Sequence, residues 1–414
     1  MKVAVLGAGV VGVAAAWFLR EAGHEVVVID RQSAAGMETS FANGGQISVS
    51  HAEPWANPGA LAKIIKWLGR EDAPLLFRLQ ADPQQWLWGL RFLAECLPGR
   101  NRVNTVQLVR LGLYSRAALR QLRASTGIEY DQLDRGILHF YTERKELEAA
   151  ARSADFMRAL GSDRLLKTPN ECVAIEPALA AIRDRLAGGS YSAEDETGDA
   201  HKFTRALATL CAEKGVRFEH GARIERIAAE GGRISGVEVT GRGIVRADAY
   251  VVSLGSYSPW LVRPLGISLA IYPAKGYSVT MPVKDAAAAW TVSLGDEGHK
   301  LVFARLGDRL RIAGTAELAG YDTSVNEARC RAILQRTLEL FPGAGDETQA
   351  KYWAGLRPAT PGNIPYIGRT RYPNLFLNTG HGTLGWTHAC GSGRALADIV
   401  SGRKPEVDFS FSQP

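Results

Sequence analysis

The sequence predicts an α/β fold whose parallel sheet binds a dinucleotide. Residues 2–6 and 25–29 are short β-branched apolar runs, typical of strands buried on both faces. Between them, a glycine-rich turn at 7–12 opens a segment of helix-forming composition at 13–22, and Asp30 ends the second run. A strand, a glycine turn, a helix, a second strand and an acid in this spacing indicate a dinucleotide site.

The turn between the two strands supplies groups that suit a pyrophosphate. Gly7 permits the tight turn, and Gly9 lets the backbone approach the phosphates. Gly12 lets the helix lie close to the strand. The helix N-terminus offers unpaired N–H groups, and Asp30 can accept hydrogen bonds from ribose hydroxyls. The residues that we expect to contact the cofactor here are Gly7, Gly9, Val11, Gly12, Asp30 and Arg31.

A secretory signal is the alternative interpretation of this stretch. Lys2 precedes an apolar run, and alanines follow at 14–16. The glycines inside the apolar segment, and the second strand with its terminal acid, argue against a signal.

Length and composition bound the class of protein. The 414 residues suffice for two hydrophobic cores, and 46% hydrophobic with 22% charged residues is ordinary for a globular enzyme. A net charge of +6 from dispersed arginines does not indicate a nucleic-acid binder, and no apolar stretch approaches the length that crosses a bilayer. Five scattered cysteines indicate a reducing compartment, and eight histidines without ligand spacing predict no metal site.

A glycine- and polar-rich stretch at 32–51 follows the acid, and it is too long for a simple connection. Its glycines allow close approach to a ligand, and Ser40 and Asn43 can bond phosphate or ribitol oxygens. A flexible surface loop is the alternative, and we favour cofactor contact. The contacts expected from this loop are Ser40, Asn43, Gly45 and Gln46.

Residues 55–123 have helical composition. Apolar side chains at core-like spacing are expected to pack inward, and they are Trp67, Leu68, Trp86, Leu87, Leu90, Phe92 and Leu93. Arginines are densest at 100–123. A solvated helix face is the interpretation that we favour for them. Adhesion to an anionic membrane surface, with Trp67, Trp86 and Trp88 at the interface, is the alternative.

The rest of the chain mixes strands and helices. Predicted strands cover 137–141, 269–280, 299–306, 310–314 and 375–378, and predicted helices cover 145–160, 201–214, 325–340 and 386–400. Residues 216–254 read as a β-meander that returns to a buried strand ending at Gly255, which is how a flavoprotein with two dinucleotide-binding motifs closes its cofactor domain. The cofactor domain is therefore interrupted. It comprises 1–54, 170–262 and 351–414, and a substrate-binding cap comprises 55–169 and 263–350.

Residues 351–393 carry the predicted chemistry. Arg357 offers a rigid fork for a substrate carboxylate, with a structural salt bridge as the alternative. A second glycine-rich turn opens a helix near Trp386, and it suits the N1–C2=O edge of a reduced isoalloxazine because the first turn already holds the phosphates. His381 is a catalytic group or packs beside the flavin. The further cofactor contacts expected are Gly255, Gly380, Gly382, Thr383, Leu384 and Gly385.

These motifs resemble, nearly end to end, the flavin subunits of bacterial D-amino-acid dehydrogenases, within the D-amino-acid oxidase and glycine oxidase superfamily. The resemblance is densest at VLGAGVVGVA (5–14), ETSFANGGQIS (38–48), DETGD (195–199), YPAKGYS (272–278) and NTGHGTLGW (378–386). Two features depart from the family pattern: Gly44 replaces a frequent alanine, and the chain ends soon after Pro405.

The resemblance implies bound FAD on an interrupted Rossmann-like domain. It also implies oxidative deamination of D-amino acids to 2-oxo acids and ammonia by hydride transfer to flavin N5. Electrons are then expected to pass to a quinone or a partner subunit, at a cytoplasmic position peripheral to the membrane. Arg357 takes the position of the carboxylate-binding arginine, and Tyr272 and Lys275 lie on the strand that roofs the substrate site, so these three and His381 form the expected catalytic set.

A non-catalytic flavin-binding module, in which Arg357 merely pairs with an acid, is one alternative to this activity. Two enzymatic alternatives also remain open. One is an FAD-dependent oxidase that acts on a D-amino acid, glycine or D-hydroxyproline, uses oxygen and releases hydrogen peroxide. The other is a nicotinamide-linked 2-hydroxy-acid dehydrogenase, which the interrupted domain disfavours because both halves of that fold usually run continuously.

Overall fold

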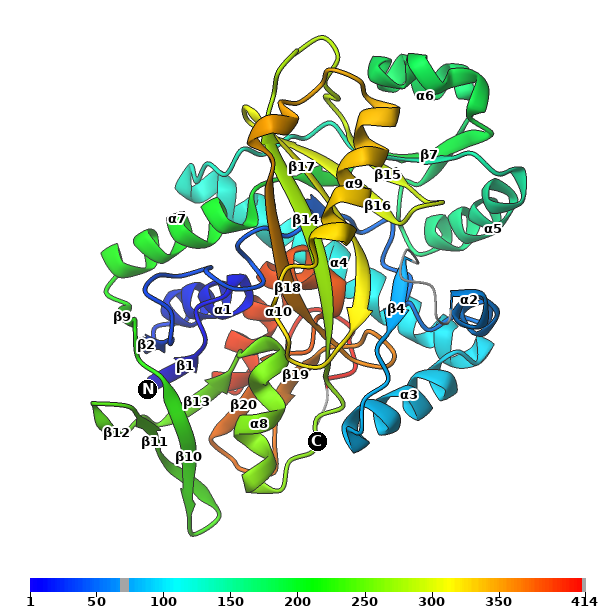
Figure 1. The fold of residues 1–414 in the computed structure, drawn as a ribbon. Coiled ribbons are helices and arrows are strands. Elements are labelled where there is room, and N and C mark those ends of the chain that lie inside the picture. The colour runs from blue at the N-terminus through cyan, green and yellow to red at the C-terminus, as the bar shows by residue number, and fades with distance from the viewer. Residues whose placement is uncertain (68–73, 412–414) are drawn as a thin grey trace.

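A six-stranded sheet forms the base of the molecule (Figure 1). The structure is a computed structural model that describes residues 1–67 and 74–411. The strand order is β19-β20-β13-β1-β2-β9, in which β19 runs antiparallel to β20 and the other pairs are parallel. The strands are β1 (Lys2–Leu6), β2 (Glu25–Ile29), β9 (Arg217–Glu219), β13 (Ala249–Val252), β19 (Tyr366–Arg369) and β20 (Leu375–Thr379).

Side chains of β1 and β2 alternate between two hydrophobic cores, as strand geometry requires. Val3 and Val5 pack on the side of the helices, whereas Ala4 and Leu6 pack on the side of a small antiparallel sheet. The helices are α1 (Val10–Glu21), α7 (Ala200–Glu213) and α10 (Gly385–Val400), and the small sheet is β10 (Ile224–Glu230), β11 (Arg233–Val239) and β12 (Gly243–Val245). Both faces of the parallel sheet are therefore covered, which explains its continuous apolar runs.

A nine-stranded sheet lies above this base (Figure 1). Its order is β18-β14-β17-β16-β15-β5-β7-β6, with β4 paired to β17. The strands are β4 (Leu75–Phe77), β5 (Ile137–Tyr141), β6 (Leu165–Lys167), β7 (Gly188–Ser192), β14 (Tyr272–Pro282), β15 (Ser293–Asp296), β16 (Leu301–Leu306), β17 (Arg309–Leu318) and β18 (Lys351–Ala359). The remaining elements are β3 (Gln46–Ile47), β8 (Glu196–Thr197), α2 (Ala60–Trp67), α3 (Pro83–Glu95), α4 (Pro98–Thr126), α5 (Arg144–Ala159), α6 (Pro169–Ile175), α8 (Ser258–Val262) and α9 (Glu327–Leu340).

Two strands lie in a different sheet from the one that the sequence division suggests. β7 and β18 fall within the stretches expected to form the cofactor domain, and both pair in the nine-stranded sheet instead. β18 pairs with β14 along its whole length, from Tyr272 opposite Ala359 to Thr280 opposite Lys351. Arg357 therefore stands on the sheet that covers the cofactor domain.

The predicted meander at 216–254 is also only partly correct. β9 joins the parallel sheet next to β2, and the last expected strand divides into β12 and β13. The division falls at the charged residues Arg246 and Asp248, and the Asp248 carboxylate accepts a hydrogen bond from the backbone N–H of Lys2.

On helix α3, only some of the apolar side chains that we expected to pack inward are buried. Trp88 and Phe92 are buried, but Trp86, Leu87, Leu90 and Leu93 are between 41% and 67% exposed. With 3.6 residues per turn, positions 86, 90 and 93 lie on the helix face opposite position 88. The side chain of Trp67 and the whole of Leu68 lie outside the described part of the chain.

The arginines of α4 are not a purely solvated face, because many of them pair with acids of the same chain. Arg120 and Arg123 reach the buried Glu196 at 2.5 and 2.7 Å. Arg116 lies 3.7 Å from the buried Asp195. These pairs hold α4 to the segment that precedes α7.

Candidate active site

A cavity of about 1280 Å³ lies between the two sheets. It is larger than the ~300–1,000 Å³ typical of small-ligand pockets, so it suits a dinucleotide with a substrate beside it. Most of the predicted site residues line it, and these are Gly7, Gly9, Val11, Asp30, Arg31, Ser40, Asn43, Gly45, Gln46, Gly255, Arg357, Gly380, His381, Gly382, Thr383, Leu384 and Gly385. Gly12, Tyr272 and Lys275 do not line it.

The β1–α1 turn has the geometry that only glycine allows. Gly7 has φ +111°, and a Cβ there would lie 2.5 Å from the carbonyl oxygen of Ser253. A Cβ on Gly12 would lie 2.0 Å from the carbonyl oxygen of Gly7, so Gly12 packs the helix onto the turn behind the cavity wall. Gly9 faces the cavity at the N-cap of α1, where helix N–H groups point toward a ligand.

Asp30 fastens the end of β2 to this turn. Its carboxylate accepts hydrogen bonds from the backbone N–H of Ala8 at 2.6 Å and of Gln32 at 2.7 Å. Burial raises the pKa of Asp30 even though these two donors favour the charged form. Arg31 next to it pairs with Glu38 at 2.6 Å, which fixes the start of the following loop.

The loop at 32–51 lies along the cavity, and its side chains hold it there. The Ser40 hydroxyl accepts a hydrogen bond from the N–H of Val10 at 3.0 Å, at the first turn of α1. Asn43 accepts from the N–H of Gly45 at 3.0 Å, and the amide of Gln46 donates to Ser293 at 2.9 Å. Residues 32–51 therefore form a hydrogen-bonded loop on the cavity wall, and the alternative of a flexible surface loop is not supported.

The second glycine turn lines the same cavity as the first. β20 ends at Thr379, Gly380 and Gly382 have φ +82° and +55°, and α10 begins at Gly385. A Cβ on Gly393 would lie 2.9 Å from the backbone of Ala14, so α10 packs directly against α1. The N-terminal ends of both helices line the same cavity.

Arg357 projects from β18 to the cavity without a counter-ion. Its Nη1 donates to the carbonyl oxygen of Thr315 at 2.9 Å, and no carboxylate of the described residues lies within ion-pair distance. Arg357 is half-buried where it lines the cavity, and this burial lowers its pKa to about 10, so it stays cationic at neutral pH. A desolvated cation without a partner is costly, and an anionic ligand would remove that cost. The structural salt bridge considered for this residue has no acid partner in the described chain.

Residues 2–399 match the family of FAD dependent oxidoreductases. The chain belongs to this family. The curated relatives include a D-amino acid dehydrogenase of Dechloromonas aromatica, 58% identical over 99% of both chains, and one of Paramagnetospirillum magneticum, 59% identical over 99% of this chain and 97% of the relative. Among solved structures, the glycine oxidase of Geobacillus kaustophilus superposes with a TM-score of 0.77 at 23% identity, over 99% of this chain and 98% of the other. That likeness confirms the predicted fold.

The cavity of this FAD dependent oxidoreductase presents polar atoms that suit the cofactor. The side-chain N and O atoms of Asn378, the hydroxyl of Ser253 and Nε2 of His381 are buried on the cavity wall and bond no other group of the described chain. Buried polar atoms are normally paired, so these atoms fit a polar ligand. Together with the two glycine turns and Asp30, they would hold FAD across the sheet.

His381 is uncharged. Burial lowers its pKa to about 3, and the neighbouring His388 adds to that effect. Such a ring is a weak proton acceptor at neutral pH, so of the two roles considered for His381 the structure favours packing beside the cofactor over acid–base catalysis.

Tyr272 and Lys275 are buried behind the wall. The Lys275 ammonium donates to Asp322 at 2.8 Å, and Tyr272 packs against Trp88. Gly276 and Tyr277 of the same strand line the cavity instead. The strand that the resemblance identifies lines the cavity, but the side chains of Tyr272 and Lys275 do not reach it.

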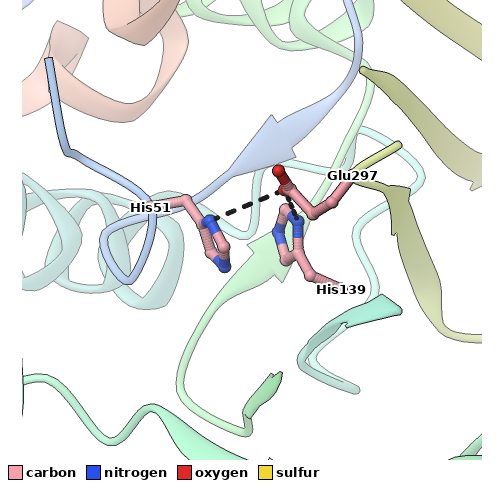
Figure 2. Close-up of side chains that lie close together, drawn as sticks. All are labelled: His51, His139 and Glu297. Carbon is pink, nitrogen blue, oxygen red and sulfur yellow. Dashed lines mark hydrogen bonds and ion pairs between the residues drawn. The ribbon is translucent and has the colours of Figure 1, made fainter. Parts of the chain in front are cut away.

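Three side chains that sequence spacing did not connect meet at another part of the wall (Figure 2). His139 on β5 bonds Glu297 at 2.8 Å, and the His51 ring stacks on His139 with centroids 3.4 Å apart and planes 20° apart. Lys300 holds the other carboxylate oxygen of Glu297 at 2.5 Å. Because the imidazole planes are nearly parallel, their lone pairs do not converge on one point as metal ligands would.

No helix within residues 1–67 and 74–411 is long and apolar enough to span a membrane.

Proposed function

We propose that the chain oxidises D-amino acids to 2-oxo acids and ammonia, with bound FAD as the electron acceptor. The observation that carries the proposal is Arg357, a cation without an acid partner among the described residues that lines the same cavity as the two glycine turns. The names of relatives 58–59% identical over nearly the whole chain support the D-configuration and the dehydrogenase reaction.

Arg357 would bind the substrate carboxylate and fix the position of the Cα–H bond. A guanidinium offers parallel N–H donors, and its bond to Thr315 restricts its rotation. FAD, when bound, takes up the hydrogen and the electron pair released from Cα. The amine nitrogen gives up a proton to solvent, and water adds to the resulting imine to release ammonia and the 2-oxo acid. Neutral His381 is too weak a base to take this proton.

We also propose that the electrons pass to a membrane quinone and that α3 contacts the bilayer. Its outer face carries Trp86, Leu90 and Leu93, and this stripe continues to Leu97, which is 60% exposed. Arg91 of the same helix and Arg100 of α4 are exposed, and Arg100 pairs with Glu95 at 3.5 Å; both arginines suit anionic headgroups. The inner face of the same helix lines the cavity through Trp88 and Phe92, so one helix separates the cavity from the proposed bilayer surface.

Arg357→Ala and Arg357→Lys test the substrate part of this proposal. We expect Arg357→Ala to lower kcat/KM for D-alanine by 100-fold or more while FAD content stays unchanged, and Arg357→Lys to recover only part of it because an ammonium cannot replace the fork. Arg403→Ala is the control, because this arginine is 55% exposed and pairs with Asp398 at the surface. Unchanged kcat/KM in Arg357→Ala would remove the carboxylate site from the proposal.

Vesicle binding tests the acceptor part. The wild-type protein should sediment with phosphatidylglycerol vesicles and reduce a quinone within them, and Leu90→Glu should lose both properties while it still reduces a soluble dye. Leu166→Glu is the matched control, because Leu166 is a similarly exposed leucine on β6, far along the nine-stranded sheet from β14. Rapid reduction of oxygen with release of peroxide, and no vesicle binding, would favour the oxidase alternative.

A further inference from the structure

A strained residue lies directly beside Arg357. Thr315 has φ +52°, a left-handed conformation that is a rare outlier for a β-branched side chain. It lies in an irregular stretch of the β14–β17 pair, where the register shifts between Lys275 opposite Glu317 and Tyr277 opposite Gly314. Such strain persists only where the surrounding structure enforces it, and it is commonest at functional sites.

The bulge shapes the position of Arg357. The Arg357 side chain crosses from β18 over Gly276 on β14, and a Cβ on Gly276 would lie 2.2 Å from its guanidinium. Nη1 then donates to the carbonyl oxygen of Thr315 on β17. The strained conformation of Thr315 therefore directs this carbonyl toward the arginine.

The hydroxyl of Thr315 has no partner. Oγ1 is buried and bonds no other group of the described chain, and Thr315 lines the cavity. Thr315 and Arg357 both line the cavity, and the bond from Arg357 to the Thr315 carbonyl makes these two residues neighbours there. A ligand is the group that would satisfy it.

We propose that Thr315 is a substrate-binding residue whose hydroxyl donates a hydrogen bond to the carboxylate held by Arg357. The carboxylate is favoured over the substrate ammonium because a cation would be repelled by the neighbouring guanidinium. The carboxylate would thus receive donors from two strands, the guanidinium of β18 and the hydroxyl of β17. This inference rests on the proposed function of Arg357.

Binding of a carboxylate that cannot be oxidised tests the inference without turnover. Propionate added to the flavin-loaded protein should perturb the visible flavin spectrum, which gives a Kd. Thr315→Val keeps the shape and the β-branch but removes the hydroxyl, and we expect it to raise the Kd for propionate and the KM for D-alanine by about 10-fold. Thr315→Ser restores the hydroxyl and should lie within about 3-fold of wild type.

Each outcome separates this inference from the function on which it rests. If Arg357→Ala loses propionate binding while Thr315→Val binds it as wild type does, the role of Thr315 is refuted and that of Arg357 stands. If Thr315→Ser loses as much affinity as Thr315→Val, the residue acts through packing and the hydrogen bond is refuted. If Arg357→Ala binds propionate as wild type does, the carboxylate site itself is wrong.

Discussion

Gly276→Ala should disable the substrate site without touching the cofactor. The added Cβ would lie 2.2 Å from the Arg357 guanidinium, whereas ordinary contacts begin near 3.4 Å, so the guanidinium must move by about 1 Å. Its 2.9 Å hydrogen bond to Thr315 would then break. A displacement of ~1 Å in a group that positions the substrate costs roughly 100-fold in rate, which corresponds to about 2.7 kcal/mol.

Steady-state kinetics with D-alanine and a dye acceptor measure the effect, and flavin absorbance measures the cofactor content. Gly89→Ala is the control, because no atom lies within 4 Å of a Cβ at that position on α3. We expect a roughly 100-fold fall in kcat/KM for Gly276→Ala, full FAD content in both variants, and wild-type kinetics for Gly89→Ala. Near-normal kcat/KM in Gly276→Ala would refute the reasoning, since the guanidinium could then move without consequence.

Three further predictions concern the cofactor and stability. Asp30→Ala should raise the FAD dissociation constant by 10-fold or more, because the carboxylate fastens the glycine turn on the cavity wall. Released flavin fluorescence measures the constant, and Asp248→Ala is the control. Burial lowers the pKa of His388 to about 4, so between pH 6.5 and 4 the unfolded chain binds a proton at this residue and the folded chain does not. The wild type should therefore lose up to ~1.4 kcal/mol of its free energy of unfolding per pH unit as the pH falls, and His388→Leu should remove that loss. Urea titrations at pH 7, 6 and 5 measure the difference. Glu196→Gln should lower the free energy of unfolding by about 1–2 kcal/mol in the same titration at pH 7, because it removes the buried charge that Arg120 and Arg123 share and leaves them only Glu194 and Asp134; a loss below about 0.5 kcal/mol would show that these pairs contribute little.

The features predicted from the sequence are those that depend on neighbouring residues. The turn at 7–12, Asp30 after the second strand and the second turn at 380–385 each follow local rules for strands, glycine and helix termini. Each of these stretches lies on the cavity wall. The FAD dependent oxidoreductase family and the fold were predicted on the same residues.

The features that were missed depend on contacts between distant segments. Thr315 and Gly276 gain their roles only when β14 and β17 pair with a shifted register, and residue spacing carries no signal of that shift. The same is true of His139 and Glu297, which meet because β5 and β15 are neighbours in the sheet. On α3, apolar residues occupy both faces, so composition could not tell the packed Trp88 from the exposed Leu90.

The central claim is that Arg357 positions a D-amino acid against bound FAD. Anaerobic mixing of the flavin-loaded protein with D-alanine or L-alanine tests it most directly, because loss of the visible flavin band reports a single oxidation without any later acceptor. We predict bleaching by D-alanine alone in the wild type and bleaching at least 100-fold slower in Arg357→Ala. A protein that carries no flavin, or bleaching by D-alanine that is equally fast in both proteins, would contradict the account.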